Sequence, residues 1–191
     1  KLNPETCNAT ALITPGGATT FCKGSSVVLT ANSGIGLTYQ WKRNGANIAG
    51  ATSINYNANK SGNYTVLVNN GFCTALSSAL VVTVNNTPTA TITNMDATNN
   101  LCIDASIKLK ANGGAGLTYQ WYKGASALIG ETGQFYFATT TGNYKVKVTN
   151  ASGCSKTSVP YTIVNECKLE NENLQSITLY PNPTSDIINI E

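Results

Sequence analysis

An internal repeat constrains this chain of 191 residues more than any other feature. The pentamer LTYQW occupies residues 37–41 and again residues 117–121, an offset of 80 residues. The tripeptide GNY recurs at the same offset, at 62–64 and 142–144. Self-similarity at a fixed period over most of a chain indicates two copies of one fold rather than one large domain.

Each copy predicts short β-strands separated by turns. In the first copy, apolar side chains occupy every second position of SSVVLTA (25–31), LTYQWKR (37–43) and NYTVLV (63–68). That period is typical of strands with one buried face. Gly- and Asn-rich stretches such as SGIG and NGAN lie between these segments and are typical of β-turns. We therefore predict an all-β chain in which roughly seven strands per copy build a β-sandwich.

Composition and charge exclude several functions. The net charge is only +3 and no cluster of Lys or Arg is present, which argues against a nucleic-acid partner. No apolar run reaches the roughly 18 residues of a transmembrane helix, so we expect no transmembrane segment. Because the chain has no histidine, neither a Ser–His–Asp triad nor a Cys–His pair can activate a nucleophile.

The acidic residues do not predict a catalytic or metal site. Apart from Glu5, Asp96, Asp104 and Glu131, the acidic residues all lie from Glu166 onward. Their spacing suits neither the paired carboxylates of a glycosidase nor the clustered oxygen ligands of a calcium site. We expect a non-enzymatic chain with no cofactor and no bound metal.

Six cysteines in a chain without histidine indicate disulfides rather than a zinc site, since no two of them lie at CxxC spacing. An even number of cysteines on a chain predicted to be rich in strands is typical of an oxidising compartment outside the cytosol. The six are Cys7, Cys22, Cys73, Cys102, Cys154 and Cys167.

Several motifs resemble immunoglobulin-like domains. KSGNYTV (60–66) resembles the run that enters strand F of immunoglobulin domains. The longer pattern from FCKGSSVVL to SGNYTVLVNNGFC is similar to the immunoglobulin-like repeats of secreted Bacteroidetes proteins, over residues 12–166. The resemblance implies two tandem immunoglobulin-like β-sandwich domains. We place a lead-in at residues 1–11, domain one at 12–86 and domain two at 90–166.

The same resemblance implies roles for four aromatic residues. Trp41 and Trp121 would be the buried tryptophans of strand C. Tyr64 and Tyr144 would be tyrosine-corner residues, whose hydroxyl groups bond to nearby backbone. The usual disulfide between strands B and F is missing, so each core is expected to pack without it. Its positions hold Ala31, Val66, Ala111 and Val146.

Immunoglobulin topology limits which cysteines can pair. It places Cys22 at the bottom of domain one and Cys73 at its top, roughly 25 Å apart at about 3.3 Å per residue. A disulfide joins Cα atoms only about 4.4–6.8 Å apart. The alternative, which the family resemblance favours, is the intradomain scheme Cys22–Cys73 and Cys102–Cys154. We predict instead Cys7–Cys73, Cys22–Cys154 and Cys102–Cys167.

The end of the chain changes in character. KLENENLQS (168–176) is polar and acidic, which is typical of a linker. ITLYPNPTSDIINIE (177–191) resembles the start of a type IX secretion sorting domain. That resemblance implies export across the outer membrane by the type IX secretion machinery, and a parent protein that is longer at both ends. The alternative is an ordinary proline turn that leads into a strand.

One surface is predicted to differ between the two copies. GQFYFA (133–138) carries Phe135 and Phe137 where the first copy has asparagines, and Tyr122 stands where the first copy has a lysine. If the tyrosine between the two phenylalanines points inward, both phenyl rings point outward. Phe135, Phe137 and Tyr122 are therefore the candidate surface contact. The alternative is that the phenylalanines pack under a loop or an edge strand.

Two functions remain open. The first is a spacer or adhesion module of a secreted or cell-surface bacterial protein, placed before the sorting signal and contacting a protein or polysaccharide at the cell surface. The second is a carbohydrate-binding accessory module of a secreted glycoside hydrolase, which would need exposed aromatic rings to stack on sugars. Because most aromatic residues alternate inward, we favour the spacer.

Overall fold

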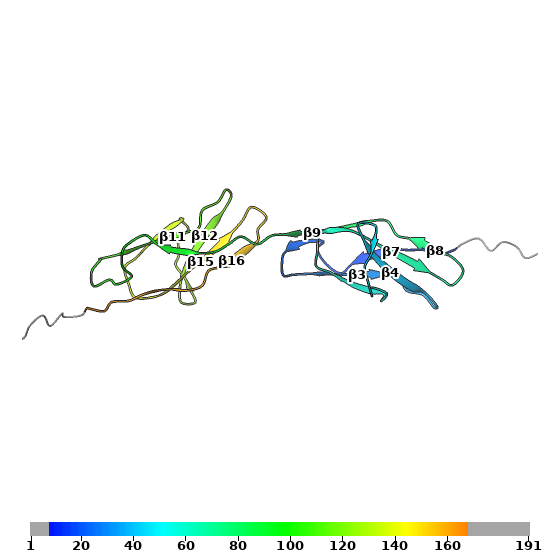
Figure 1. Ribbon diagram of the computed structural model, residues 1–191, viewed down its shortest axis with the longest axis horizontal. Helices are drawn as coiled ribbons and strands as arrows, with labels where there is room; N and C mark the ends of the chain where they lie inside the picture. The colour runs from blue at the N-terminus through cyan, green and yellow to red at the C-terminus, as the bar shows by residue number, and fades with distance from the viewer. Residues whose placement is uncertain (1–7, 168–191) are drawn as a thin grey trace, which may run out of the picture.

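The alternating apolar pattern produces short strands and no helix in the computed structural model, which describes residues 8–167. Figure 1 shows two similar units lying end to end, domain one from β1 to β9 and domain two from β10 to β17. None of the described residues forms an apolar helix of membrane-spanning length.

Domain one is a sandwich of two sheets. Every strand pairing in it is antiparallel except that of β2 with β9, which is parallel. The smaller sheet has the order β1 (Ile13–Pro15), β3 (Val27–Ala31) and β6 (Asn55–Ala58). The larger sheet has the order β2 (Thr20–Cys22), β9 (Leu80–Asn85), β7 (Gly62–Asn69), β4 (Thr38–Arg43) and β5 (Ala46–Asn47), with β8 (Thr74–Leu76) paired to β7.

Domain two repeats this arrangement with one loss. The counterpart of β2 is reduced to an isolated bridge between Asn100 and Val164. The smaller sheet has the order β10 (Ile92–Asn94), β11 (Ile107–Ala111) and β14 (Phe135–Ala138). The larger sheet has the order β13 (Ser126–Ala127), β12 (Thr118–Lys123), β15 (Gly142–Thr149) and β16 (Ser155–Thr157), with β17 (Tyr161–Ile163) paired to β15.

One tryptophan lies at the centre of each sandwich. Trp41 and Trp121 are fully buried, which confirms them as core residues. The indole nitrogen of Trp41 donates a hydrogen bond to the Ser53 carbonyl, and that of Trp121 donates to the Gly133 carbonyl, each at 2.9 Å. Burial therefore leaves no polar atom of either ring without a partner, which is what a buried indole requires.

The tyrosine corners are also confirmed. Tyr64 and Tyr144 are buried, and their hydroxyl groups donate to the carbonyls of Lys60 and Thr140, each at 2.8 Å. Because each bond spans four residues, it closes the turn that leads into the long strand β7 or β15. The turn and the core are thereby held by the same side chain.

A buried serine hydroxyl accepts a backbone hydrogen bond from the long strand of each domain, at the position where the usual disulfide is missing. The amide of Val66 donates to the Ser77 hydroxyl at 3.0 Å, and the amide of Val146 donates to the Ser158 hydroxyl at 3.1 Å. Both serines are buried. Each lies between the two short strands that pair with β7 or β15, so the hydroxyl satisfies a backbone amide where the ladder is interrupted.

Trp121→Ala should lower the free energy of unfolding of domain two by about 3–5 kcal/mol, because it removes a fully buried ring and leaves a cavity. Trp41→Ala should do the same to domain one. Urea unfolding followed by circular dichroism measures both losses. Phe137→Ala is the control: Phe137 is 54% exposed, and we expect a loss of less than about 1 kcal/mol. Equal losses in all three variants would contradict the core role.

Candidate functional site

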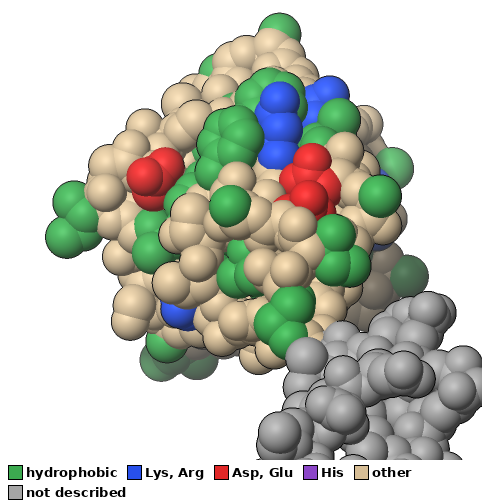
Figure 2. All heavy atoms as spheres, turned by 90° about the vertical axis from the view of Figure 1, so that its left-hand side faces the viewer, with side chains coloured by type: hydrophobic (Ala, Val, Ile, Leu, Met, Phe, Trp, Pro, Cys, Tyr) green, Lys and Arg blue, Asp and Glu red, His purple; other side chains and the backbone are tan. Residues whose placement is uncertain are grey.

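The outer face of the smaller sheet of domain two carries two phenylalanines beside two lysines. Strand register places Lys108 opposite Phe137 and Lys110 opposite Phe135. Phe135 and Phe137 are 41% and 54% exposed. We call Phe135, Phe137, Lys108 and Lys110 the aromatic–lysine face. Figure 2 views the end of domain two, where ring-bearing hydrophobic side chains adjoin basic ones and acidic side chains lie near them.

The lysines lie over the rings rather than beside them. The Nζ atom of Lys108 lies 4.8 Å from the ring centre of Phe135 and 5.6 Å from that of Phe137. The Nζ atom of Lys110 lies 5.6 Å from the ring centre of Phe135. These distances are typical of cation–π contacts. The flat faces that a sugar would stack on are therefore already in contact with an ammonium group.

Tyr122 does not belong to this face. It lies in β12 of the larger sheet, where it is opposite Lys145 of β15, whereas Phe135 and Phe137 lie in β14 of the smaller sheet. Tyr122 is half-buried. The structure thus brings two of the three candidate surface residues together and places the third on the other sheet.

Tyr136, between the two phenylalanines, points the other way. Its ring centre lies 5.5 Å from that of Trp121 and 5.4 Å from that of Tyr144, so it forms the middle of a stack inside domain two. Burial, reinforced by the neighbouring Tyr144, raises the pKa of Tyr136 to about 12. The inward tyrosine is what turns both phenylalanines outward, as the alternation of a strand requires.

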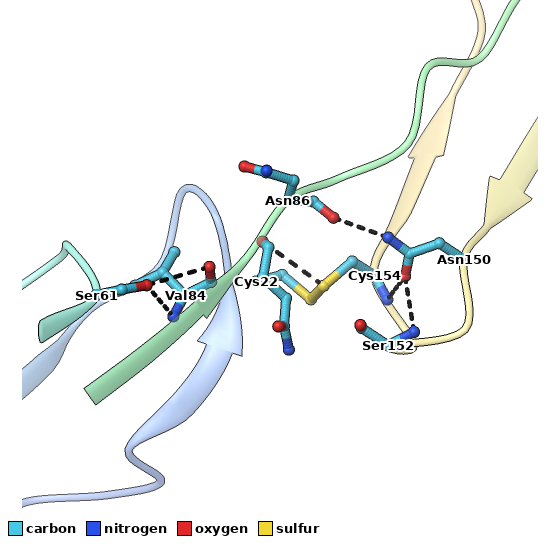
Figure 3. The surroundings of a disulfide bond; sticks show 8 residues. Cys22, Ser61, Val84, Asn86, Asn150, Ser152 and Cys154 are labelled. Atoms are coloured by element: carbon cyan, nitrogen blue, oxygen red, sulfur yellow. Dashed lines mark hydrogen bonds between the residues drawn. A yellow bond between two sulfur atoms is a disulfide. The ribbon is translucent and has the colours of Figure 1, made fainter. Parts of the chain in front are cut away.

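A disulfide joins the two domains. Cys22 at the end of β2 bonds to Cys154 just before β16, with an S–S distance of 2.01 Å and Cα atoms 5.6 Å apart. Cys154 is fully buried, so this bond is shielded on its domain-two side. Figure 3 shows the bond beside the strand that leaves domain one. This is one of the three predicted pairs.

Asn150 adds a polar contact at the same junction. Its side-chain amide donates to the carbonyl of Asn86, at 2.8 Å, in the connector, which is the segment 86–91 between β9 and β10. Its side-chain oxygen accepts from the amides of Ser152 and Cys154, at 3.1 and 3.0 Å (Figure 3). In domain one Asn70 holds the matching loop, accepting from the amide of Cys73 at 2.9 Å. Asn150 therefore orders the loop that presents Cys154 and also fastens the connector to it.

A second disulfide lies at the far end of domain two. Cys102 bonds to Cys167 with Cα atoms 5.2 Å apart, which is another of the predicted pairs. Both cysteines are exposed. Cys73 is also disulfide-bonded, but its predicted partner Cys7 lies outside the described residues. The described pairs exclude the intradomain scheme, because Cys22 and Cys102 are each bonded elsewhere.

The described residues include no group of three His, Cys, Asp or Glu side chains that could hold a metal ion. Among residues 8–167 the raised pKa values belong to core tyrosines. Burial also raises the pKa of Tyr64, with a smaller effect of Tyr56, and Arg43 opposes the change. A tyrosine held neutral inside a stack is a feature of packing. The non-enzymatic character of the chain stays a prediction.

Comparison with known proteins finds weak likenesses to solved structures and no matching family. No protein-family model matches the chain, and no curated protein matches it. One chain of the crystal structure of a mouse coronavirus receptor-binding domain complexed with its murine receptor is similar at 12% identity, covering 82% of this chain and 100% of that chain, with a TM-score of 0.40. An I-band fragment of titin is similar at 12% identity, covering 78% of this chain and 64% of that chain, with a TM-score of 0.39.

A chimeric titin tandem carrying a fibronectin peptide is similar at 17% identity, covering 82% of this chain and 100% of that chain, with a TM-score of 0.29. We draw no functional argument from likenesses this weak. The immunoglobulin-like class of both domains is shown by their own strand order, buried tryptophans and tyrosine corners.

Two features of these sites were missed by sequence reasoning. The lysines of the aromatic–lysine face were missed, although both stand at alternate positions of one predicted strand and so share its outer face. Asn150 was missed because its contact with Asn86 spans 64 residues, and no local pattern reports such a distance. The repeat offset was an available signal, since it aligns Asn150 with Asn70 in the matching loop.

The raised pKa of Tyr136 predicts a loss of stability in alkali. The ordinary tyrosine pKa of 10.0 applies to the unfolded chain, while the folded domain keeps its proton up to about pH 12. The unfolded state therefore loses the proton first, and stability is present in full below about pH 10 and falls as the pH rises through about 12. Tyr136→Phe should show a smaller loss between pH 8 and pH 11 in urea unfolding. An equal loss in both proteins would contradict the assignment.

Removal of the junction disulfide should let the domains reorient independently. In the native chain, residual dipolar couplings should fit one alignment tensor for both domains, because Cys22–Cys154 and the Asn150 contact hold them together. Cys22→Ser with Cys154→Ser should require two tensors. Cys102→Ser with Cys167→Ser removes a bond inside domain two and should leave a single tensor. A single tensor in both variants would show that the disulfide does not order the junction.

Proposed function

We propose that this chain is a load-bearing, non-catalytic spacer of an exported protein. Two immunoglobulin-like domains form a module without an evident reaction centre, and the disulfides indicate an oxidising environment. The single observation that carries the proposal is the position of the Cys22–Cys154 bond. It joins residues that are 132 apart in sequence, near the beginning of one domain and near the end of the other.

This bond gives force a short covalent route through the molecule. From Asn8 to Cys22 the chain has 15 residues, and from Cys154 to Cys167 it has 14. A pull on the two ends of the described part therefore crosses 29 residues and bypasses 23–153. Since a fully extended residue spans about 3.4 Å, the route cannot exceed about 100 Å, against about 550 Å for the same part of an unbridged chain.

A second route would exist if the predicted Cys7–Cys73 bond forms. Together with Cys102–Cys167, it would carry force across residues 73–102 alone. Two covalent routes of similar length would then run in parallel through both domains. Such an arrangement keeps the separation of the two ends nearly constant even when a domain unfolds, which is what a spacer between a working part and an anchor requires.

The cellular setting of the spacer is part of the same proposal. Residues 177–191 support export by the type IX secretion machinery of a bacterium, because they resemble the start of its sorting domain. This segment and the linker at 168–176 lie outside the described residues. The spacer would then hold an upstream part of its protein at the outer cell surface, where it contacts a protein or a polysaccharide.

A carbohydrate-binding accessory module of a secreted glycoside hydrolase is the second candidate. The exposed rings of Phe135 and Phe137 favour it. The ammonium group of Lys108 over both rings weighs against it, because stacking of a neutral sugar would have to displace a cation–π contact. We therefore rank this candidate below the spacer.

Force spectroscopy on the whole chain tests the proposal. With handles at both chain ends, the oxidised protein should extend to about 200 Å, made up of the short route and the two terminal segments fully extended. In dithiothreitol it should reach about 650 Å, because all 191 residues then bear the load. A chain with all six cysteines changed to serine is the matched control and should reach the longer value with or without reductant.

Stepwise lengthening of the oxidised protein well beyond about 200 Å would overturn the load-bearing role. Identical curves for the oxidised and reduced protein would overturn it as well, because the route depends on sulfur–sulfur bonds and not on the stability of either fold.

A further inference from the structure

Domain one carries positive charge with no acidic residue to balance it. Between Glu5 and Asp96 the sequence contains no Asp or Glu at all. The same stretch contains Lys23, Lys42, Arg43 and Lys60. No cation of this domain can therefore form an ion pair within its own sandwich. Such a domain attracts anions, and the question is where its cations converge.

Two of them converge on a cleft at the open side of the sandwich. The cleft has a volume of about 390 Å³ and lies between the edge strand β5 of one sheet and the edge strand β6 of the other. A volume of this size suits one or two sugar rings. The cleft is lined by Arg43, Ala46, Asn47, Ile48, Tyr56, Asn59 and Lys60.

The fold positions both cations. A Cβ atom on Gly62 would lie 2.8 Å from Cγ of Arg43, so the absent side chain at Gly62 makes room for the arginine stem. The carbonyl of Lys60 accepts the tyrosine-corner hydrogen bond of Tyr64 at 2.8 Å, which fixes the turn that carries the lysine. Arg43 is half-buried and Lys60 is exposed. One cation is thus held by packing and the other reaches over the cleft from an anchored turn.

The second copy shows the same place with its charge satisfied. The repeat offset puts Lys123 in place of Arg43 and Thr140 in place of Lys60. There the Nζ atom of Lys123 donates to the Thr140 hydroxyl at 2.9 Å. The one cation of domain two at this place has a partner from its own turn. Domain one has two cations here and no hydroxyl group at position 60, and the hydroxyl group beside Arg43 is that of the buried Tyr64. The difference between copies of one fold points to a ligand of domain one.

We propose that this cleft binds an acidic saccharide through a carboxylate or sulfate group. A guanidinium and an ammonium group are the partners that an oxyanion requires, and the guanidinium can bind it with two parallel hydrogen bonds. Asn47 and Asn59 each offer an amide that both donates and accepts, as sugar hydroxyls do. Tyr56 adds an aromatic ring and a hydroxyl group to the wall. An acidic peptide would use the cations but has no need of this set of amides.

Saccharide binding in the cleft does not depend on the load-bearing role. A chain that fails to bind saccharides can still carry load through Cys22–Cys154, and a chain that extends under force can still bind them. A negative result in the binding experiment would therefore leave the force experiment unaffected, and the reverse also holds.

Isothermal titration of the whole chain tests the cleft. The probes are trigalacturonate, a sulfated trisaccharide, the neutral trisaccharide galactotriose and tetraglutamate. We expect the acidic trisaccharides to bind at least about tenfold more tightly than galactotriose, a difference that shrinks as salt is added. The better of the carboxylated and sulfated probes identifies the anionic group. Lys60→Thr, which introduces the residue of the second copy, and Arg43→Gln should each weaken binding about tenfold or more.

Lys42→Gln is the matched control, since it removes the charge beside Arg43 on a side chain that does not line the cleft. It should change the affinity less than about twofold. An equal loss in Lys42→Gln and Lys60→Thr would overturn the site in favour of diffuse attraction. Tighter binding of tetraglutamate than of either acidic trisaccharide would overturn the saccharide as ligand. Lys60 is exposed, so melting curves should show that Lys60→Thr stays folded. The absence of any binding of the acidic trisaccharides to the native chain at millimolar concentration would count against the proposal.

Discussion

The burial of one tryptophan between two sheets supports everything else in each domain. Trp121 contacts Tyr136, and Tyr136 contacts Tyr144, which closes the turn before the longest strand. In domain one the rings of Trp41, Tyr56 and Tyr64 contact one another in the same order. Because the middle tyrosine of each stack lies on an edge strand, its inward position decides which side chains of that strand face solvent. Core packing therefore sets the outer surface as well.

With both cores built alike, the differences between the domains lie outside them. The outer face of β14 presents phenylalanines under lysines, while the matching strand β6 presents asparagines. The side cleft of domain one holds two cations, while the matching place in domain two holds a lysine bonded to a threonine. Similar scaffolds with different surfaces fit the proposed spacer, in which both copies share the mechanical role and each surface contact belongs to one copy only.

A disulfide bond joins the two domains covalently, in addition to the peptide connection between them. The Cys22–Cys154 bond links the end of β2 to the loop before β16, and Asn150 fastens the connector to that loop. Hydrogen bonds alone at an exposed junction contribute little, since water competes for the same groups. The sulfur–sulfur bond does not have this weakness, and for this reason the proposed spacer would resist extension whatever the stability of either sandwich.

The sequence by itself determined the number of domains, the sandwich class and the buried positions of Trp41 and Trp121, which follow from the periodicity and from the offset between the two copies. For the cysteines it left two pairing schemes open, and the structure decided for Cys22–Cys154 because the end of β2 meets the loop before β16. Only the tertiary structure decided that Lys108 lies over Phe135, that Tyr122 is on the other sheet and that Arg43 and Lys60 share a cleft. Such contacts depend on the register between neighbouring strands and on which sheet edges lie side by side. The packing of the whole domain sets the register and the position of the edges.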